Sequence, residues 1–277
     1  MNESSKYRRT IITLAAGMSL LLIVNGCDKN GSREVQGNVI SIRGTVTIES
    51  GKETGSHPQP LTIVSKLSVD DRLETSPDAV ASLLLIPGIF VQIGAETEMV
   101  IEELRVEKQG DAMVNAMKSR LATLHLNRGV IYASLPSVGS GSCELNVQTG
   151  IGTLVAQRGA LFSMRLTSET VRVICVDGEV QWSGARGGRV DEISQGYFRD
   201  YRRQNVLNGN FERELTPITE DAGAQGDAAA TLESAAAFDE FVLRVRNAPA
   251  PKSSQPIQLP TVQPPNDTGG NSPRKNI

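Results

Sequence analysis

The chain has 277 residues, with 28 Lys and Arg against 31 Asp and Glu, and a formal charge of -3. It carries no cationic surplus to neutralise phosphates, so nucleic acid is excluded as a predicted partner. Hydrophobic residues at 39% and aromatic residues at 4% predict a folded domain with a core of Val, Ile and Leu. Two histidines are too few for a histidine-rich metal site or a histidine-dependent triad.

The N-terminus carries a targeting pattern. A basic segment precedes an uncharged apolar run at residues 11–24, which is shorter than the ~20 residues of a membrane span and typical of a signal peptide. The motif Val24-Asn25-Gly26-Cys27 follows and resembles a bacterial lipobox, in which the cysteine thiol receives diacylglycerol. We therefore predict a signal peptide at 1–26 and lipid attachment at Cys27, with an ordinary secretory signal as the alternative.

Lipidation would anchor the protein to a membrane of the bacterial cell envelope, on the periplasmic side, and the inner and outer membranes both stay open. The polar residues up to Gln36 make residues 27–36 a tether of at most ~30 Å, which keeps the domain near the bilayer.

Two further cysteines, Cys143 and Cys175, share strand parity with apolar neighbours, so both thiols are expected to face the core. In an oxidising compartment they can form a disulfide. The alternative is two buried free thiols, and the sequence does not decide between the two.

The segment from 37 to 205 alternates apolar and polar residues with turn signals between short runs. One short helix interrupts the pattern, predicted over 112–122 with Asp111 as its N-cap. Asp177-Gly178 predicts a hairpin, and a glycine turn is expected near Gly129. Strands are expected in 37–48 (a pair around Gly44), 61–64, 69–77, 81–85, 89–93, 99–106, 123–135, 145–155, 159–166, 170–176 and 179–182. The fold class is all-β, with short antiparallel strands in a β-roll or sandwich.

The order of several short motifs resembles the periplasmic FecR domain, over about residues 37–182. Three positions depart from that pattern: Asp70-Asp71 replaces Gly-Asp, Gly150 replaces a proline, and Ala160 replaces a threonine. The motifs are Gly44-Thr-Val, Val69-Asp-Asp-Arg-Leu-Glu-Thr, Ala81-Ser-Leu-Leu-Leu-Ile-Pro-Gly, Leu126-Asn-Arg-Gly-Val, Val147-Gln-Thr-Gly-Ile-Gly-Thr-Leu-Val-Ala-Gln-Arg-Gly-Ala and Val173-Ile-Cys-Val-Asp-Gly-Glu-Val.

The resemblance implies a binding or structural role for the β domain. FecR regulators join such a domain to a cytoplasmic segment that binds a sigma factor, and about ten residues before the apolar run leave no room for one. Signal relay to the cytoplasm is therefore not carried over from the family.

The sequence shows no catalytic motif, and no catalytic, cofactor-binding or metal-binding residue is predicted. Adjacent carboxylates occur at Asp70-Asp71 and Glu102-Glu103. Because neighbours in a strand point to opposite faces, neither pair is expected to act on one substrate. The histidines, His57 and His125, lie in different settings and cannot by themselves supply a zinc site.

A mixed aromatic and basic segment at 196–203 is a candidate partner surface, because such side chains are common at binding hot spots. The alternative is a final strand whose aromatics cover the end of the β core while the arginines stay in water. The residues singled out are Tyr197, Arg199, Tyr201, Arg202 and Arg203.

The C-terminal region changes in composition twice. A helix is predicted at 227–246, with Asp227 as its N-cap and a broad apolar side. Seven of the 13 prolines fall in 248–277, which predicts a disordered or polyproline-like tail.

The sequence therefore predicts a lipid-anchored envelope protein without catalysis or cofactor, whose β domain binds a protein or an envelope polymer in sensing or envelope assembly. One alternative is a scaffold that acts through the helix and tail. Another is an envelope hydrolase whose site is assembled from residues distant in sequence.

Overall fold

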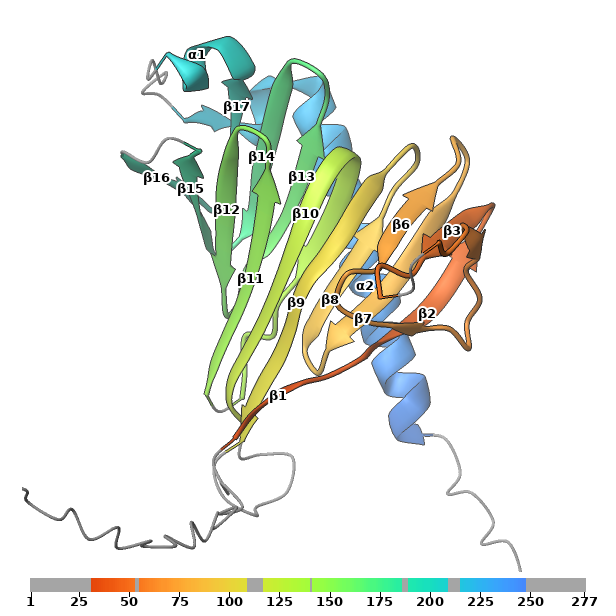
Figure 1. The fold of residues 1–277 in the computed structure, drawn as a ribbon. Helices are drawn as coiled ribbons and strands as arrows, with labels where there is room; N and C mark the ends of the chain where they lie inside the picture. Colours follow the sequence, from red (N-terminus) through yellow and green to blue (C-terminus); the bar gives the residue numbers. More distant parts are fainter. Residues whose placement is uncertain are drawn as a thin grey trace, which may run out of the picture.

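The computed structural model describes residues 31–52, 55–108, 117–139, 141–185, 189–208 and 215–247. Two β-sheets face each other around the hydrophobic core, and one long helix lies on the outer face of one sheet (Figure 1). The prediction of an all-β domain followed by a C-terminal helix is confirmed. The predicted tail at 248–277 lies outside the described residues.

The first sheet, called sheet A, is antiparallel except for the parallel pair β10 and β11. The short strand β1 (Ser32–Glu34) pairs with the far end of β9. The strand order is β4 (Gln59–Pro60), β3 (Val46–Glu49), β6 (Arg72–Thr75), β9 (Glu98–Lys108), β10 (Met117–Ser134), β11 (Ser142–Thr149), β12 (Gly152–Gln157), β15 (Glu179–Gly184) and β16 (Val190–Ser194).

The second sheet, sheet B, is antiparallel throughout its described pairs. Its order is β5 (Lys66–Leu67), β2 (Gly37–Arg43), β7 (Val80–Ile86), β8 (Ile89–Ile93), the second part of β10, β13 (Leu161–Leu166), β14 (Thr170–Asp177), β17 (Tyr197–Arg202) and β18 (Thr216–Pro217). Both sheets are open, with β4 and β16 at the edges of one and β5 and β18 at the edges of the other. The short helix α1 (Arg203–Leu207) follows β17.

Strand β10 belongs to both sheets. Its first part pairs with β9 and β11, and its last part, from Gly129, pairs with β8 and β13. Gly129 has φ +93°, and a Cβ there would lie 2.3 Å from the Thr97 hydroxyl oxygen. The predicted glycine turn is therefore wrong, because this residue bends a continuous strand from one sheet to the other.

Two other predicted strand pairings are wrong for a related reason. Strands β14 and β15, which flank Asp177-Gly178, do not form a hairpin, because β14 pairs in sheet B and β15 in sheet A. Strands β2 and β3, which flank Gly44, likewise pair in different sheets. Alternation identifies which residues face the core, but it does not say which strand lies alongside.

Three predicted boundaries also change. The described part of the predicted 112–122 helix, Met117 onward, is the start of β10. The predicted tether ends earlier than Gln36, because β1 is already paired with β9. The C-terminal helix α2 runs from Ala222 to Asn247, five residues longer at its start than predicted. Its first turn is capped by Asp221, whose carboxylate accepts a hydrogen bond from the backbone N–H of Ala224 at 2.7 Å.

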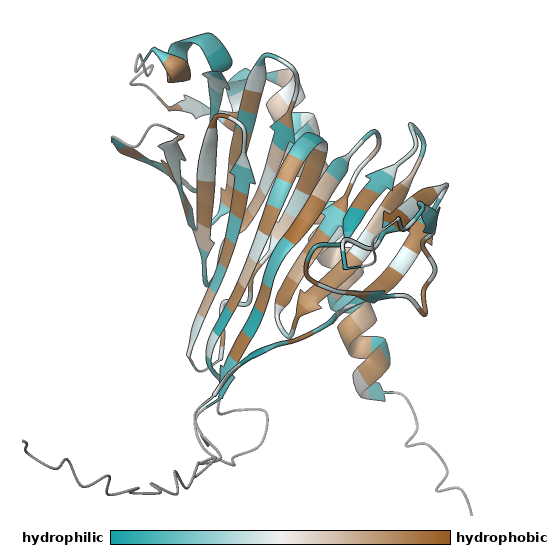
Figure 2. Ribbon diagram, viewed as in Figure 1, coloured by the Kyte–Doolittle hydropathy of each residue, from teal (hydrophilic) through white to brown (hydrophobic). Residues whose placement is uncertain are grey.

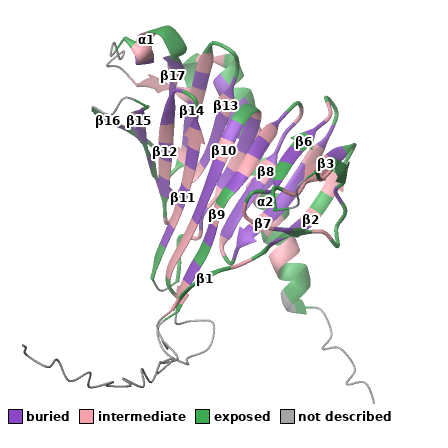
Figure 3. Cartoon of the chain, viewed as in Figure 1, coloured by how far each residue is buried: buried purple, intermediate pink, exposed green. Residues whose placement is uncertain are grey.

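The core between the sheets consists mainly of Val, Ile and Leu, as the composition predicts, together with Trp182. Strands such as β11 alternate buried and partly exposed residues, and the same alternation appears in the hydropathy and burial of the front sheet (Figures 2 and 3). One face of each strand of sheet A therefore contacts the core, and its other face is outside.

Helix α2 is held on the outer face of sheet B by charge and by apolar contact. Arg165 of β13 forms a bidentate ion pair with Asp227, the residue expected to cap the helix. Arg172 of β14 donates to Asp200 on β17 at 2.7 Å and to Asp221 at 2.9 Å. Farther along, the ring of Phe238 stacks on Phe90 of β8 at 4.6 Å. These charge-assisted hydrogen bonds and the ring contact fix helix α2 against the outer face of sheet B.

Replacing Gly129 with alanine should lower the free energy of unfolding by at least about 2 kcal/mol, because the left-handed φ and the contact with Thr97 both oppose a side chain. Gly196→Ala is the matched control: its φ is +83° and no atom lies within 4 Å of its added Cβ, so about 1 kcal/mol is expected. Urea unfolding of both variants measures the difference, and equal losses would contradict a steric role for Gly129.

Candidate functional site

Strand β9 contains a bulge that places two carboxylates on the same face. Glu103 lies opposite Thr123 and Ile101 lies opposite Leu124, so Glu102 has no partner in the ladder. The residues on either side, Ile101 and Leu104, are both buried. Glu102 and Glu103 therefore both lie on the outer face of sheet A. The expectation that they point to opposite faces is wrong, because simple alternation does not hold across a bulge.

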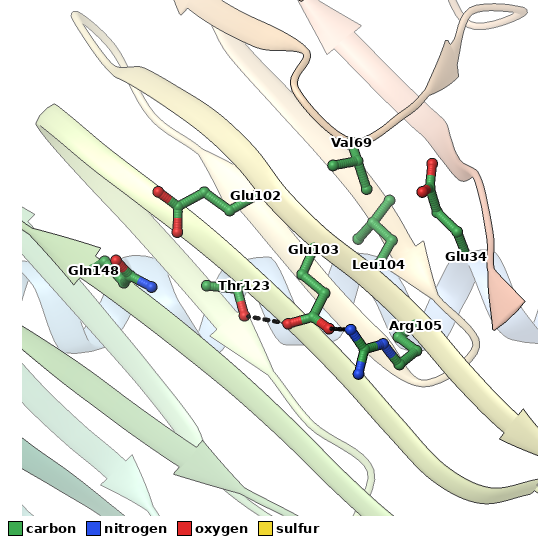
Figure 4. Close-up of a pocket in the computed structure, with 8 residues that line it drawn as sticks. All are labelled: Glu34, Val69, Glu102, Glu103, Leu104, Arg105, Thr123 and Gln148. Atoms are coloured by element: carbon green, nitrogen blue, oxygen red, sulfur yellow. Dashed lines mark hydrogen bonds and ion pairs between the residues drawn. The ribbon is translucent and has the colours of Figure 1, made fainter. Parts of the chain in front are cut away.

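These two carboxylates line a pocket of about 420 Å³ on the outer face of sheet A (Figure 4). Glu103 forms an ion pair with Arg105 and accepts a hydrogen bond from the Thr123 hydroxyl at 3.4 Å. Glu102 points away from that pair, and its carboxylate lies 3.3 Å from Nδ1 of His125. The remaining lining residues are Glu34 of β1, Val69, Leu104 and Gln148. The pocket combines carboxylate, guanidinium, amide and hydroxyl groups with the apolar residues Val69 and Leu104.

The polar character continues across sheet A. Cross-strand register places Thr123, Asn146, Val155, Gln181 and Glu192 in one row from β10 to β16. At the far end of the sheet the carboxylate of Glu179 raises the pKa of Glu192, because two like charges lie side by side. The surface can offer hydrogen bonds from neutral side chains, with carboxylates at both ends of the row.

The predicted partner surface on β17 is only partly a surface. Arg199 and Tyr201 are 7% and 3% exposed, which corrects their assignment as partner-contacting residues. Residues 197, 199 and 201 share the inner face of sheet B, so alternation turns the last two toward the core. Arg202 and Arg203 are exposed, and both line a separate pocket of about 560 Å³ beside Ser168, Glu169 and Thr170. Tyr197, at 38% exposure, lies at the other end of the strand.

The buried members of that segment link the two sheets. Arg199 forms an ion pair with Asp191 of β16 at 2.8 Å. The ring of Tyr201 stacks on Trp182 of β15 at 4.7 Å, and burial raises the pKa of the tyrosine hydroxyl. These contacts join β17 of sheet B to β15 and β16 of sheet A, so the segment closes one end of the core.

Cys143 and Cys175 are both buried, and both are free thiols. Cys143 lies on β11 in sheet A and Cys175 on β14 in sheet B, and the disulfide considered from the sequence is not formed. Burial raises the pKa of the Cys175 thiol to about 12 and also raises that of Cys143. Both therefore remain protonated at neutral pH and behave as small core residues.

Cys27, the predicted lipid attachment site, lies outside the described residues. Within the described ranges no three His, Cys, Asp or Glu side chains gather into a group that could hold a metal ion. In the same ranges no helix has both the length and the apolar character needed to span a bilayer.

Residues 71–181 match the family model described as FecR protein. The chain contains a FecR domain. This match lies inside the segment that resembled FecR from its motifs, and it includes the β9 bulge and most of the strands of sheet A. The FecR domain is thus the part of the molecule that carries the outer-face pocket, apart from Glu34 and Val69.

No curated protein matches the chain. Among solved structures, two crystal structures of a Parabacteroides distasonis ATCC 8503 protein, described as a candidate anti-sigma factor, share 14% identity with it. The match covers 48% of this chain and 56% or 55% of the other, so it spans about half the length of that protein. The TM-score of both matches is 0.35.

Part of the site was open to prediction from the sequence. The alternation of Cys143, Leu145 and Val147 with Glu144, Asn146 and Gln148 already separates an inner face from a polar outer face. In the sequence, the only sign of the bulge in β9 is the pair Glu102-Glu103, and adjacent carboxylates are common in ordinary strands. The pocket therefore could not be predicted from the sequence and is seen only in the structure.

Arg199→Met should lower the free energy of unfolding by about 3–5 kcal/mol, because it removes the arginine at 2.8 Å from the buried Asp191 and leaves Arg189 at 3.6 Å as its nearest cation. Adding Asp191→Asn should recover part of that loss. Arg202→Met, on the same strand but exposed, should change stability by less than about 0.5 kcal/mol. Denaturant unfolding tests all three, and equal effects at 199 and 202 would contradict the buried pair.

Glu192→Gln should stabilise the protein at neutral pH and have no effect at a pH below the ordinary range of glutamate. The pKa of Glu192 is raised in the folded state, so the wild-type protein loses stability as pH rises through that raised value. Glu144→Gln is the control, because Glu144 accepts a hydrogen bond from Asn146 at 3.1 Å and does not face a carboxylate partner there. Thermal unfolding of both variants from about pH 3 to about pH 8, which covers the titration of glutamate carboxyl groups, measures the change in stability.

Proposed function

We propose that the protein is a lipid-anchored component of the bacterial cell envelope, and that its FecR domain binds a protein partner in sensing or in envelope assembly. Binding, without catalysis, is its role. The domain assignment supports a regulatory rather than an enzymatic protein. The signal peptide and lipobox pattern at Cys27 support an anchor on the periplasmic side of a membrane.

The choice of binding surface rests on one observation: a helix covers the outer face of sheet B, and no described helix covers the outer face of sheet A. Helix α2 occupies the outer face of sheet B, where Arg165 and Arg172 hold it in place. In the described part of the chain no helix lies on the outer face of sheet A (Figure 1). A partner therefore meets the polar face around the Glu102 and Glu103 pocket.

The composition of that face favours a protein partner over an apolar ligand. Its row of Thr, Asn and Gln side chains offers both donors and acceptors, and its pocket adds carboxylates that can pair with basic side chains. The only tryptophan, Trp182, is fully buried in the core and is not available to stack on a sugar. An envelope polymer is accordingly the second choice.

The scaffold alternative, in which α2 recruits the partner, has less support. The helix face that carries Ala224, Ala228 and Thr231 is buried against sheet B, and Asp227 is paired with Arg165. A partner could reach only the opposite, polar side of this part of the helix.

Site-specific photocrosslinking in the native envelope tests the proposal. A photoreactive residue at Gln148 or Gln181, on the outer face of sheet A, should yield a discrete crosslinked protein species. The same residue at Ala229, on the exposed side of α2, is the matched control and should yield none. Crosslinks from position 229 but not from 148 or 181 would support the scaffold reading and overturn the proposed surface.

A further inference from the structure

One end of the domain combines the start of the described chain with the end of α2. Strand β1 begins there at Ser32, beside the last residues of β9, and β10 begins there at Met117, opposite Lys108. In Figure 1 the last turns of α2 reach the same level, at the lower end of the view. Two segments far apart in sequence thus leave the domain at one end.

The last turn of α2, from Leu243 on, is exposed at every residue whose burial is described. Among the helix residues whose burial is described, the fully buried ones end at Ser234, and the helix extends beyond the ends of the strands of sheet B (Figure 3). Leu243 and Val245 are 56% and 58% exposed, next to the half-buried Phe241 and Val242. The projecting end is therefore accessible and combines exposed apolar side chains with charged and polar residues, and its ribbon carries both brown and teal bands (Figure 2).

Three cationic side chains lie on strands β1, β9 and β10 at the same end of the domain. Arg33 lies in β1, Lys108 ends β9 and Lys118 is the second residue of β10, and all three are exposed. The carboxylates beside them are themselves paired: Glu107 with Lys118 at 2.8 Å, and Glu34 with Lys52 at 2.8 Å. Exposed aliphatic groups together with Lys and Arg are the combination that binds the interface of an anionic bilayer.

The position of the predicted anchor indicates what covers this surface. Cys27 precedes Ser32 by five residues, which limits the distance between lipid and domain to about 17 Å even when the chain is fully extended. We propose that this end of the domain rests on the bilayer, with Leu243 and Val245 in the headgroup region and Arg33, Lys108 and Lys118 facing anionic phospholipid. This inference rests on the lipid anchor in the proposed function, and it orients the pocket face of sheet A sideways to the membrane.

An environment-sensitive fluorophore tests the contact. The lipidated full chain is reconstituted on vesicles of phosphatidylethanolamine and phosphatidylglycerol, with the label at Leu243→Cys. Leu232→Cys is the matched control, because Leu232 lies on the same helix at 54% exposure but in its middle. The label at 243 should show a blue shift in emission and lose its quenching by aqueous iodide, and the label at 232 should show neither. The unsubstituted protein, whose Cys143 and Cys175 are buried, gives the background of labelling.

Intact-mass analysis of the native protein and of Cys27→Ser distinguishes a failure of the lipid anchor from a failure of the membrane contact at the end of α2. A diacylglycerol mass that disappears in the variant establishes the anchor, and equal behaviour of labels 243 and 232 would then overturn the membrane contact alone. A protein without lipid would overturn the anchor itself. A blue shift at 243 that grows with protein concentration in the absence of vesicles would assign this end of α2 to a contact between copies of the chain, and would also overturn the proposal.

Discussion

The architecture depends on one strand that crosses between two sheets. Strand β10 pairs with β9 and β11 before Gly129 and with β8 and β13 after it, so it holds sheets A and B in a single unit. The crossing requires a left-handed backbone at a point where Thr97 leaves no room for a side chain. The same backbone geometry recurs where the chain passes between sheets at Gly44, Gly159, Gly178 and Gly196.

The two packed sheets have two outer faces, and these faces differ in what covers them. Sheet B is covered by α2, through the arginine pairs to Asp221 and Asp227 and an apolar contact at Phe238. Sheet A presents a mainly polar row of side chains, with a bulge that places Glu102 and Glu103 together in the lining of a pocket. The covered face contributes to stability, and the open face is left for recognition. The exposed end of α2, beyond the ends of the strands of sheet B, belongs to neither face.

The candidate site shows how far sequence reasoning extends. The alternation in β11 identifies Glu144, Asn146 and Gln148 as outward-facing, because a strand has a period of two. The same rule, applied to Glu102-Glu103, fails at the bulge. In the segment 196–203 the residue types suggested a surface, yet the parity of β17 turns Arg199 and Tyr201 inward, where Asp191 and Trp182 receive them. Residue type alone did not distinguish a buried charge pair from an exposed one.

The sequence by itself determined the all-β class, the FecR-like domain, the C-terminal helix and the inward direction of Cys143 and Cys175. These follow from periodicity and from motif order, which are local properties of the chain. Only the tertiary structure decided which strands pair, where β10 changes sheets, that the two thiols stay apart, and which face α2 covers. Strand pairing and face coverage depend on contacts between residues distant in sequence, and a period-two pattern is satisfied equally well by several such arrangements.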